Sequence, residues 1–213
     1  MSWTIPSTGR RPLRSDVPRA PRVHTSPPDI IDRRSNPIRF TATTLPGAFL
    51  IELEKHADHR GFFARTFCER EFESHGLQAR YVQCSISFNL RKGTLRGMHF
   101  QAAPFQEAKL VRCSQGSIYD VIIDLRPDSP TFKRHLGVEL SAANGKTLYV
   151  PEGFAHGFQT LQDNSEVFYQ ISQFYAPEHS RGVRWNDPAF GIVWPAAERT
   201  ILERDQSYAD FQG

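Results

Sequence analysis

The chain has 213 residues, of which 39% are hydrophobic and 23% are charged, and its formal net charge is +3. A chain of this length buries roughly 70% of its unfolded surface, so we expect one domain with an extension and exclude wholesale disorder. It has no apolar run of about 18 residues, and its N-terminus lacks the apolar stretch of a signal peptide. We therefore expect neither a membrane partner nor export.

The positive charge lies in the N-terminal segment. Residues 1–36 hold seven Arg, three Asp and no Lys or Glu, a net charge of +4, so the remaining residues carry −1. A nearly neutral domain without a Lys/Arg stripe lacks the electrostatic surface that nucleic acids require, and we expect no nucleic-acid partner. The same segment contains six prolines and almost no periodic apolar pattern. We expect residues 1–36 to be a disordered arm and residues 37–213 to be the folded domain.

The cysteines bear on the cellular compartment. Cys68, Cys84 and Cys113 are odd in number and have no CxxC or Cys-His spacing, which argues against a disulfide framework or a zinc site. Free thiols persist in a reducing compartment, so we expect a cytoplasmic protein.

From residue 38 onward the chain consists of short β-rich runs separated by turn residues. Such regular short strands predict an antiparallel sandwich or barrel. Residues 68–75 and 201–205 are the helical exceptions, and the pairs Gln115-Gly116 and Asn144-Gly145 predict hairpin turns. The expected strands are residues 48–53, 77–87, 94–95, 108–113, 117–125, 132–140, 147–150, 157–161 and 166–174.

Two glycine-histidine patterns narrow the fold prediction from a general sandwich or barrel to one type. Residues 93–99 read Gly-x5-His and residues 145–156 read Gly-x5-Pro-x-Gly-x2-His, which follow the two cupin signatures. We therefore expect an all-β fold, a double-stranded β-helix or cupin-like jelly roll with a few short helices. The first signature normally reads His-x-His, in which two imidazoles on one strand face hold a metal, but its second position here is Gln101. We therefore expect no metal and no other cofactor.

A cavity in such a barrel can transfer protons without a metal. An imidazole supplies a base near neutral pH, a phenol can return a proton, and cations stabilise an anionic ligand or an enolate. This combination predicts proton abstraction beside a carbonyl group. The residues expected around the cavity are Arg96, His99, Lys109, Asp120, His156 and Tyr169.

Eight short motifs occur in order along residues 40–211. They are DHRGFF at 58–63, TLRGMHFQ at 94–101, KLVR at 109–112, YDVIIDLR at 119–126, VPEGFAHGF at 150–158, FYAP at 174–177, RWNDP at 184–188 and IVWP at 192–195. Together they resemble the dTDP-4-dehydrorhamnose 3,5-epimerases, a family of nucleotide-sugar enzymes. The resemblance implies inversion at C3, C5 or both in a nucleotide-linked 4-keto-6-deoxyhexose.

The resemblance also implies residue roles. His99, oriented by Asp205, is the base that removes the proton beside the C4 ketone, and Tyr169 is the acid on the opposite sugar face. Lys109 stabilises the enolate oxygen. The family's dimers imply a homodimer in which Arg60 can reach the cavity of the neighbouring subunit. The residues implied to bind the substrate are Arg60, Gln83, Arg96, Asp120, His156 and Arg204.

The chain departs from the family pattern at three positions that resemble nucleotide contacts. Arg65 replaces an acid, Ser85 replaces an asparagine, and Ser180 stands where a glutamate is common. We therefore expect the reaction type to be kept and the preference among nucleotides to be relaxed.

Two other functions remain open at the level of sequence. One is a non-catalytic nucleotide-sugar-binding paralogue, and the other is a metal-dependent cupin isomerase or oxygenase. The joint presence of His99, Tyr169 and Asp205 favours the epimerase over the first, because a binder needs no acid and base. The missing His-x-His pair disfavours the second.

Overall fold

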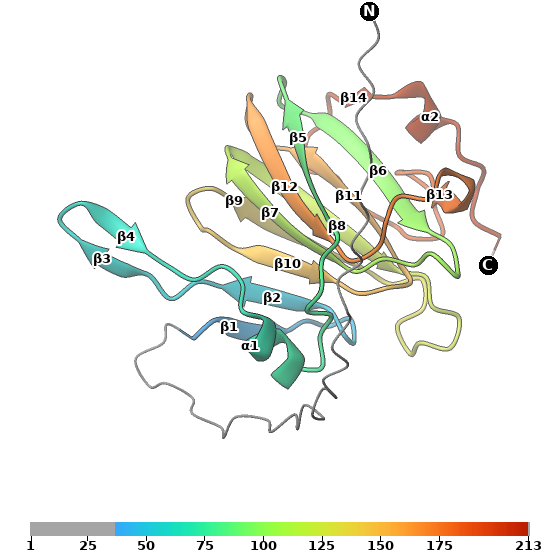
Figure 1. Ribbon diagram of the computed structural model, residues 1–213. Helices are drawn as coiled ribbons and strands as arrows, with labels where there is room; N and C mark the ends of the chain where they lie inside the picture. Colours follow the sequence, from blue (N-terminus) through green and yellow to red (C-terminus); the bar gives the residue numbers. More distant parts are fainter. Residues whose placement is uncertain (1–36, 213) are drawn as a thin grey trace, which may run out of the picture. The chain divides into compact units, whose positions relative to one another are not determined.

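A computed structural model describes residues 37–212, so the arm expected at residues 1–36 lies outside the described residues. The described chain folds into two antiparallel sheets that pack face to face and a separate two-stranded hairpin (Figure 1). The all-β jelly roll with only short helices, predicted from the sequence, is confirmed. Among these residues, no helix is long and apolar enough to cross a membrane.

The first sheet joins strands from both ends of the folded region. Its order is β1 (Arg39–Ala42), β2 (Phe49–Glu52), β10 (Thr147–Val150), β7 (Lys109–Gln115), β12 (Ser165–Ile171) and β5 (Gln83–Asn89). The second sheet runs β13 (Ser180–Gly182), β6 (Thr94–Gln101), β11 (Phe154–Thr160), β8 (Ser117–Asp124) and β9 (His135–Ser141), and β14 (Thr200–Ile201) pairs in parallel with β6.

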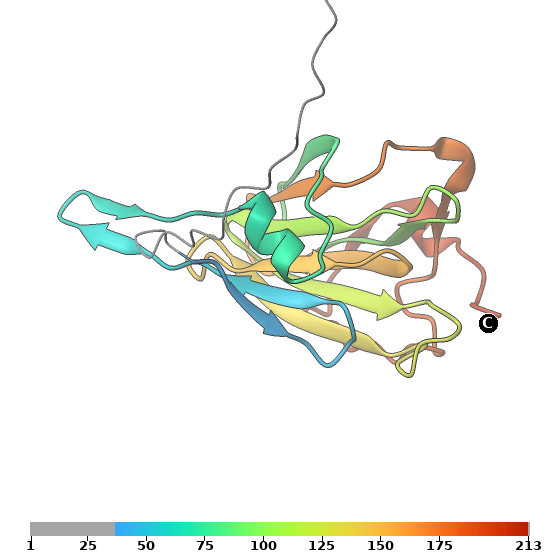
Figure 2. The same cartoon turned by 60° about the horizontal axis from the view of Figure 1, so that its bottom comes forward.

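The remaining elements are short. The hairpin consists of β3 (His56–Asp58) and β4 (Gly61–Phe63), and it projects from the body of the sandwich in both views (Figures 1 and 2). The helices are α1 (Glu69–Ser74), the 3-10 turn η1 (Pro177–His179) and α2 (Glu203–Gln206). The two helical segments expected from the sequence correspond to α1 and α2.

Strand β8 of the second sheet is buried on both faces. Ile118 and Ile122 belong to the core between the sheets, whereas Val121 and Ile123 belong to a second cluster that includes Trp194. The C-terminal segment therefore covers the outer face of this sheet. A strand buried on both faces reads as a continuous apolar run, which explains the sequence of β8.

Both expected glycine turns occur, but neither closes a hairpin. Gly116 has a φ of +75° and Gly145 has a φ of +65°, which is the left-handed region that glycine tolerates. However, β7 and β8 lie in different sheets, and so do β9 and β10. The hairpin prediction is therefore wrong at both places, because a turn signal does not specify which strands pair.

Several strand limits also differ from the sequence prediction. Strands β1, β3, β4, β13 and β14 were missed, since each has four residues or fewer and shows no visible alternation. Strand β6 extends well beyond the expected residues 94–95, because Gly97 interrupts its apolar pattern without ending the strand. Strand β5 begins at Gln83 instead of residue 77.

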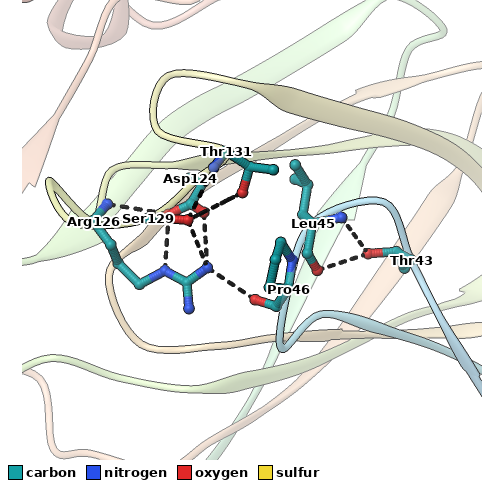
Figure 3. A network of polar contacts seen from close by, with 7 residues as sticks. All are labelled: Thr43, Leu45, Pro46, Asp124, Arg126, Ser129 and Thr131. Carbon is teal, nitrogen blue, oxygen red and sulfur yellow. Dashed lines mark hydrogen bonds and ion pairs between the residues drawn. The ribbon is translucent and has the colours of Figure 1, made fainter.

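A polar network at Asp124 joins the loop after β8 to the turn between β1 and β2 (Figure 3). The buried carboxylate accepts hydrogen bonds from Arg126 Nε at 2.9 Å and Thr131 Oγ1 at 2.7 Å, and also from Ser129. Arg126 then donates to the Pro46 carbonyl at 2.8 Å. Burial alone raises the pKa of Asp124, but these hydrogen bonds outweigh it and lower the pKa to about 2. Asp124 is thus a structural ion-pair residue, as expected of a carboxylate at a turn.

Candidate active site

A cavity of about 570 Å³ opens between the two sheets. Strands β5, β7 and β12 of the first sheet line one side, and β6 and β11 of the second sheet line the other. The segment of β14 and α2, which lies beside β6, completes the second side (Figure 1). Eight residues singled out from the sequence line it, namely Gln83, Arg96, His99, Lys109, His156, Tyr169, Arg204 and Asp205.

His99 and Asp205 form a close pair on the side of β6. His99 Nε2 lies 2.8 Å from Asp205 Oδ1, and the Gly97 amide donates to Oδ2 at 3.1 Å. The carboxylate side chain is only 3% exposed, whereas the imidazole is 32% exposed toward the cavity. The aspartate is therefore fixed behind the histidine, and the histidine faces a ligand.

The charge state of Asp205 favours one tautomer of His99. Burial raises the pKa of Asp205, but hydrogen bonds from His99, Gly97 and Arg204 outweigh it and hold the pKa below its usual value. His99 Nε2 has two neighbours that favour opposite tautomers, because the Asp205 carboxylate accepts a proton whereas Arg204 Nη2, 3.1 Å away, can only donate one. The shorter contact of 2.8 Å with the ionised carboxylate favours a proton on Nε2, which places the lone pair of the neutral imidazole on Nδ1. Nδ1 makes no hydrogen bond to any residue in 37–212 and is the ring atom that can act as a base.

A second histidine-aspartate pair lies on the neighbouring strands. His156 on β11 stands opposite His99 in the strand register, and its Nε2 lies 2.8 Å from Asp120 Oδ1 on β8. Both side chains are buried, and Asp120 Oδ2 has no hydrogen-bond partner within the described residues. Asp120 lies behind His156 and does not itself line the cavity, in contrast to the position expected from the sequence.

Tyr169 lies on β12, in the sheet that faces His99. Its ring meets the His156 ring edge-on, with centroids 6.0 Å apart and an interplanar angle of 78°. Burial, reinforced by the negative charge of Asp120, raises the pKa of Tyr169, while Arg96 and Ser87 counteract this only in part. The phenol therefore keeps its proton at neutral pH and can donate it.

The cations of the cavity are held by neighbouring side chains. Lys109 Nζ lies 2.8 Å from Glu107 Oε1, and both side chains are 11% exposed. Arg96 Nε donates to Asn89 Oδ1 at 2.8 Å, and Arg204 Nε donates to Asp205 Oδ1 at 3.3 Å. Each cation thus has a defined position before any ligand enters.

Sequence reasoning missed several lining residues, among them Ser87, Glu107 and Tyr175. Glu107 carried a usable signal, because it precedes Lys109 by two positions and residues two apart in an extended chain share a face. Tyr175 lies in the loop beyond β12, within the motif FYAP at 174–177, but no strand alternation there directed its side chain to the cavity. Its amide donates to Gln83 Oε1 at 2.8 Å, which ties this loop to β5.

Arg60 does not line the cavity of its own chain. It lies in the turn of the β3–β4 hairpin, where its Nη2 contacts Asp58 Oδ2 at 2.6 Å and its side chain is exposed. Of the three departures from the family pattern, only Ser85 lines the cavity. Arg65 pairs with Glu71 of α1 at 3.0 Å, and Ser180 lies on β13.

Gln101, which replaces the second histidine of the signature, supports the backbone around the cavity. Its Nε2 donates to the carbonyls of Phe105 and Phe174 at 3.0 and 3.2 Å, and its Oε1 accepts from the Ala176 amide at 2.7 Å. Its side chain is thereby committed to two loops. Residues 37–212 contain no group of three or more His, Cys, Asp or Glu placed to hold a metal ion.

Comparison with known proteins identifies the family. A family model described as dTDP-4-dehydrorhamnose 3,5-epimerase matches residues 42–213. The chain is 44% identical over 173 residues to the dTDP-4-dehydrorhamnose 3,5-epimerase of Methanothermobacter thermautotrophicus, covering 80% of this chain and 92% of that protein.

Solved structures of epimerases also match the chain. The epimerase of Bacillus anthracis, crystallised with TDP and PPi, matches with a TM-score of 0.80 and 39% identity, over 82% of this chain and 100% of that one. The Legionella pneumophila enzyme in complex with dTDP-4-keto-L-rhamnose matches with a TM-score of 0.74 and 34% identity, over 79% and 89% of the two chains. The protein is therefore an enzyme of the epimerase class, and the chain belongs to the dTDP-4-dehydrorhamnose 3,5-epimerase family.

Proposed function

We propose that the protein inverts both C3 and C5 of a dTDP-linked 4-keto-6-deoxyhexose. The observation that carries this proposal is that His99, backed by Asp205, and Tyr169 come from facing sheets across one cavity. Inversion requires a base on one face of the sugar and an acid on the other, and two facing walls supply that arrangement. The curated relatives are named as 3,5-epimerases, which supports inversion at both carbons.

In this proposal each inversion is a balanced proton exchange. His99 Nδ1 takes the proton from the carbon beside the C4 ketone, and the electron pair of that C–H bond moves to the ketone oxygen as an enolate. The Lys109 ammonium stabilises the enolate oxygen. The enolate then collapses, and the carbon takes the phenol proton of Tyr169 from the opposite face. Proton exchange with solvent resets both residues.

The nucleotide part of the substrate carries the negative charge. We propose that Arg96 and Arg204 bind the diphosphate, since a guanidinium fork makes two hydrogen bonds to phosphate oxygens. Gln83 and His156 add hydrogen-bonding groups to the same cavity. Asp120 acts on the substrate through His156, because it lies behind that ring.

The test is isotope exchange. The protein is incubated in heavy water with dTDP-4-keto-6-deoxyglucose, and deuterium is located by NMR. Incorporation at C3 and C5 with formation of the L-sugar is expected. Incorporation at a single carbon would restrict the activity to one position, and no incorporation with any nucleotide-linked 4-keto sugar would contradict the proposal.

We also propose a homodimer formed through the outer face of the first sheet. Because Ser85, Ser87 and Tyr169 face the cavity, strand alternation directs Ile86 and Phe168 outward, and these two residues pair in register. Ile86 is 61% exposed, and neighbouring Phe88 is exposed as well. A contiguous exposed apolar surface of this kind is typical of a protein interface.

Arg112 extends this outer face onto β7. It pairs in register with Phe168, its guanidinium lies 5.5 Å from the Phe168 ring, and its buried Nε has no hydrogen-bond partner within residues 37–212. This side chain therefore continues the surface that Ile86 and Phe168 form on the outer face of the sheet. Light scattering should give the mass of a dimer, and Ile86→Lys should lower it toward that of a monomer.

A dimer would give Arg60 a route to the substrate, through the hairpin of one subunit and the cavity of the other. Complementation tests this. Arg60→Ala and His99→Ala are each expected to be inactive, but a dimer containing one of each has one cavity with both residues intact. Activity should therefore appear when the two variants are unfolded, mixed and refolded together. No recovery would contradict action across the interface.

The three cysteines are free thiols, with Cys113 buried and Cys84 exposed. This supports a cytoplasmic location, since a reducing compartment keeps thiols unpaired.

A further inference from the structure

Glu107 is an acidic residue in a cavity otherwise suited to an anionic ligand. Besides Asp205, it is the only carboxylate among the cavity-lining residues in the described chain. Asp205 is already engaged by His99, Gly97 and Arg204. Glu107 contacts a single cation, Lys109, at 2.8 Å. A negative charge here weakens diphosphate binding, so its presence calls for a role in the chemistry.

The backbone holds Glu107 rigidly. On its C-terminal side, the Ala108 amide donates to Ser172 Oγ at 2.8 Å, and the Ala108 carbonyl accepts from the Ser172 amide at 3.0 Å. On its N-terminal side, Gln101 fixes the Phe105 carbonyl at 3.0 Å. The carboxylate is therefore presented to Lys109 from a loop fixed at both ends, which is the arrangement required for preorganised electrostatics.

The pair restricts where the ammonium can go. A lysine side chain is flexible and its charge is a point charge, so an unpaired ammonium in this cavity would move toward the diphosphate. Glu107 occupies one of its three N–H groups and leaves two to face the ligand. An ammonium held in this way would stabilise a developing oxyanion beside it more than the bound diphosphate, which favours the transition state over the bound substrate.

We propose that Glu107 is a positioning residue that holds the Lys109 ammonium at the enolate oxygen of the substrate and away from its diphosphate. This inference rests on the enolate-stabilising role proposed for Lys109. In this role Glu107 contributes to stabilisation of the transition state and not to substrate affinity, so its loss should change kcat and not raise KM.

The first test is the kinetics of Glu107→Gln, which keeps the shape and an acceptor oxygen but removes the charge. We expect kcat to fall by between about tenfold and a hundredfold, the loss that follows when a catalytic group is displaced by up to about 1 Å. KM should stay the same or fall, because the released ammonium binds the diphosphate better. The control is Glu52→Gln, which removes the acid of the Glu52–Lys146 pair, whose members lie 3.4 Å apart and do not line the cavity. It should leave both constants unchanged.

The second test is a double-mutant cycle with Lys109→Met. If Glu107 acts through Lys109, the double variant should be no slower than Lys109→Met alone. A merely structural role for Glu107 would make the two losses multiply. Glu107→Asp, which keeps the charge on a shorter side chain, should recover part of the lost kcat, and it serves as the main variant if Glu107→Gln does not fold.

The outcomes distinguish the positioning role of Glu107 from the enolate-stabilising role of Lys109. Multiplying losses, or a Glu107→Gln variant with unchanged kcat and a higher KM, would overturn the positioning role while leaving Lys109 in place. Full activity of Lys109→Met would instead refute the role of Lys109, and the inference for Glu107 would fall with it.

Discussion

His99 on β6 and His156 on β11 stand opposite each other in the strand register, yet each pairs with a different carboxylate at 2.8 Å, Asp205 and Asp120 respectively. The two imidazoles are therefore not equivalent. The His99 side chain is 32% exposed, whereas the His156 side chain, which also lines the cavity, is only 6% exposed. Its exposure to the cavity makes His99 the better base.

The proposed roles of His99 as the base and Tyr169 as the acid predict different phenotypes for their variants. His99→Ala should stop deuterium exchange at both candidate carbons, since a positioned general base contributes about two to four decades of rate. Tyr169→Phe should retain exchange but form little inverted product, because the proton still leaves on one face and none returns from the other. NMR in heavy water measures both quantities. Exchange at nearly the native rate in His99→Ala would show that another group is the base.

Asp205 should be essential for the base. Asp205→Asn keeps the shape of the side chain but cannot hold the proton on His99 Nε2, so we expect kcat to fall by about two decades or more. Because hydrogen bonds hold the pKa of Asp205 below its usual value, the carboxylate is ionised throughout the neutral range, and the acid limb of the rate profile should come from other groups. The control is Asp210→Asn, which removes a surface partner of Arg184. A native rate in Asp205→Asn would refute the dyad.

Asp124 should make the fold sensitive to acid. Its native pKa of about 2 lies below the ordinary value of 3.8, so its stabilisation is fully present above about pH 4 and is lost as the pH falls toward 2. The shift corresponds to about 2 kcal/mol in the free energy of unfolding. Asp124→Asn should lose that amount at pH 7 and show a flatter acid slope in urea titrations. Asp128→Asn, in the same loop and exposed, should match the wild type.

Strand runs and glycine-histidine spacings are local signals, and they allowed most of the jelly roll to be predicted from the sequence. Of the eight predicted residues that line the cavity, Gln83, Arg204 and Asp205 were implied only by the family resemblance. Which strands pair, and which side chains from distant segments meet, could not be predicted from such local signals. Gly116 and Gly145 read as hairpin turns, yet they connect different sheets. The role of Glu107 depends on a loop fixed by Gln101, a contact that no spacing in the sequence reveals. Arg60 does not line the cavity of its own chain, so its proposed role requires a second chain, which no local pattern in the sequence specifies.

Activity should survive exhaustive chelation. Gln101 stands where a second histidine would ligate a metal, and its amide is committed to the carbonyls of Phe105 and Phe174. The imidazoles of His99 and His156 each direct Nε2 at a separate carboxylate. The measurement is turnover before and after treatment with EDTA. Loss of activity that one equivalent of a divalent ion restores would revive a metal-dependent mechanism.

Among the three departures from the family pattern, only Ser85 is placed to affect the nucleotide preference of the enzyme. Arg65 pairs with Glu71 and Ser180 lies on β13, and neither lines the cavity, whereas Ser85 does. A serine at this position lacks the amide that can read a base edge, so we expect weak discrimination of dTDP from UDP, GDP and CDP in calorimetric titrations. One hydrogen bond to a base is worth about 1 kcal/mol, or roughly fivefold in affinity.

Ser85→Asn should restore that amide and raise the preference for dTDP by about fivefold to tenfold. The matched control is Ser74→Asn, the same substitution at an exposed serine of α1 that does not line the cavity. The control should bind all four nucleotides as the wild type does. A wild-type preference for dTDP of about a hundredfold or more would correspond to several hydrogen bonds to the base and would show that groups other than Ser85 recognise thymine.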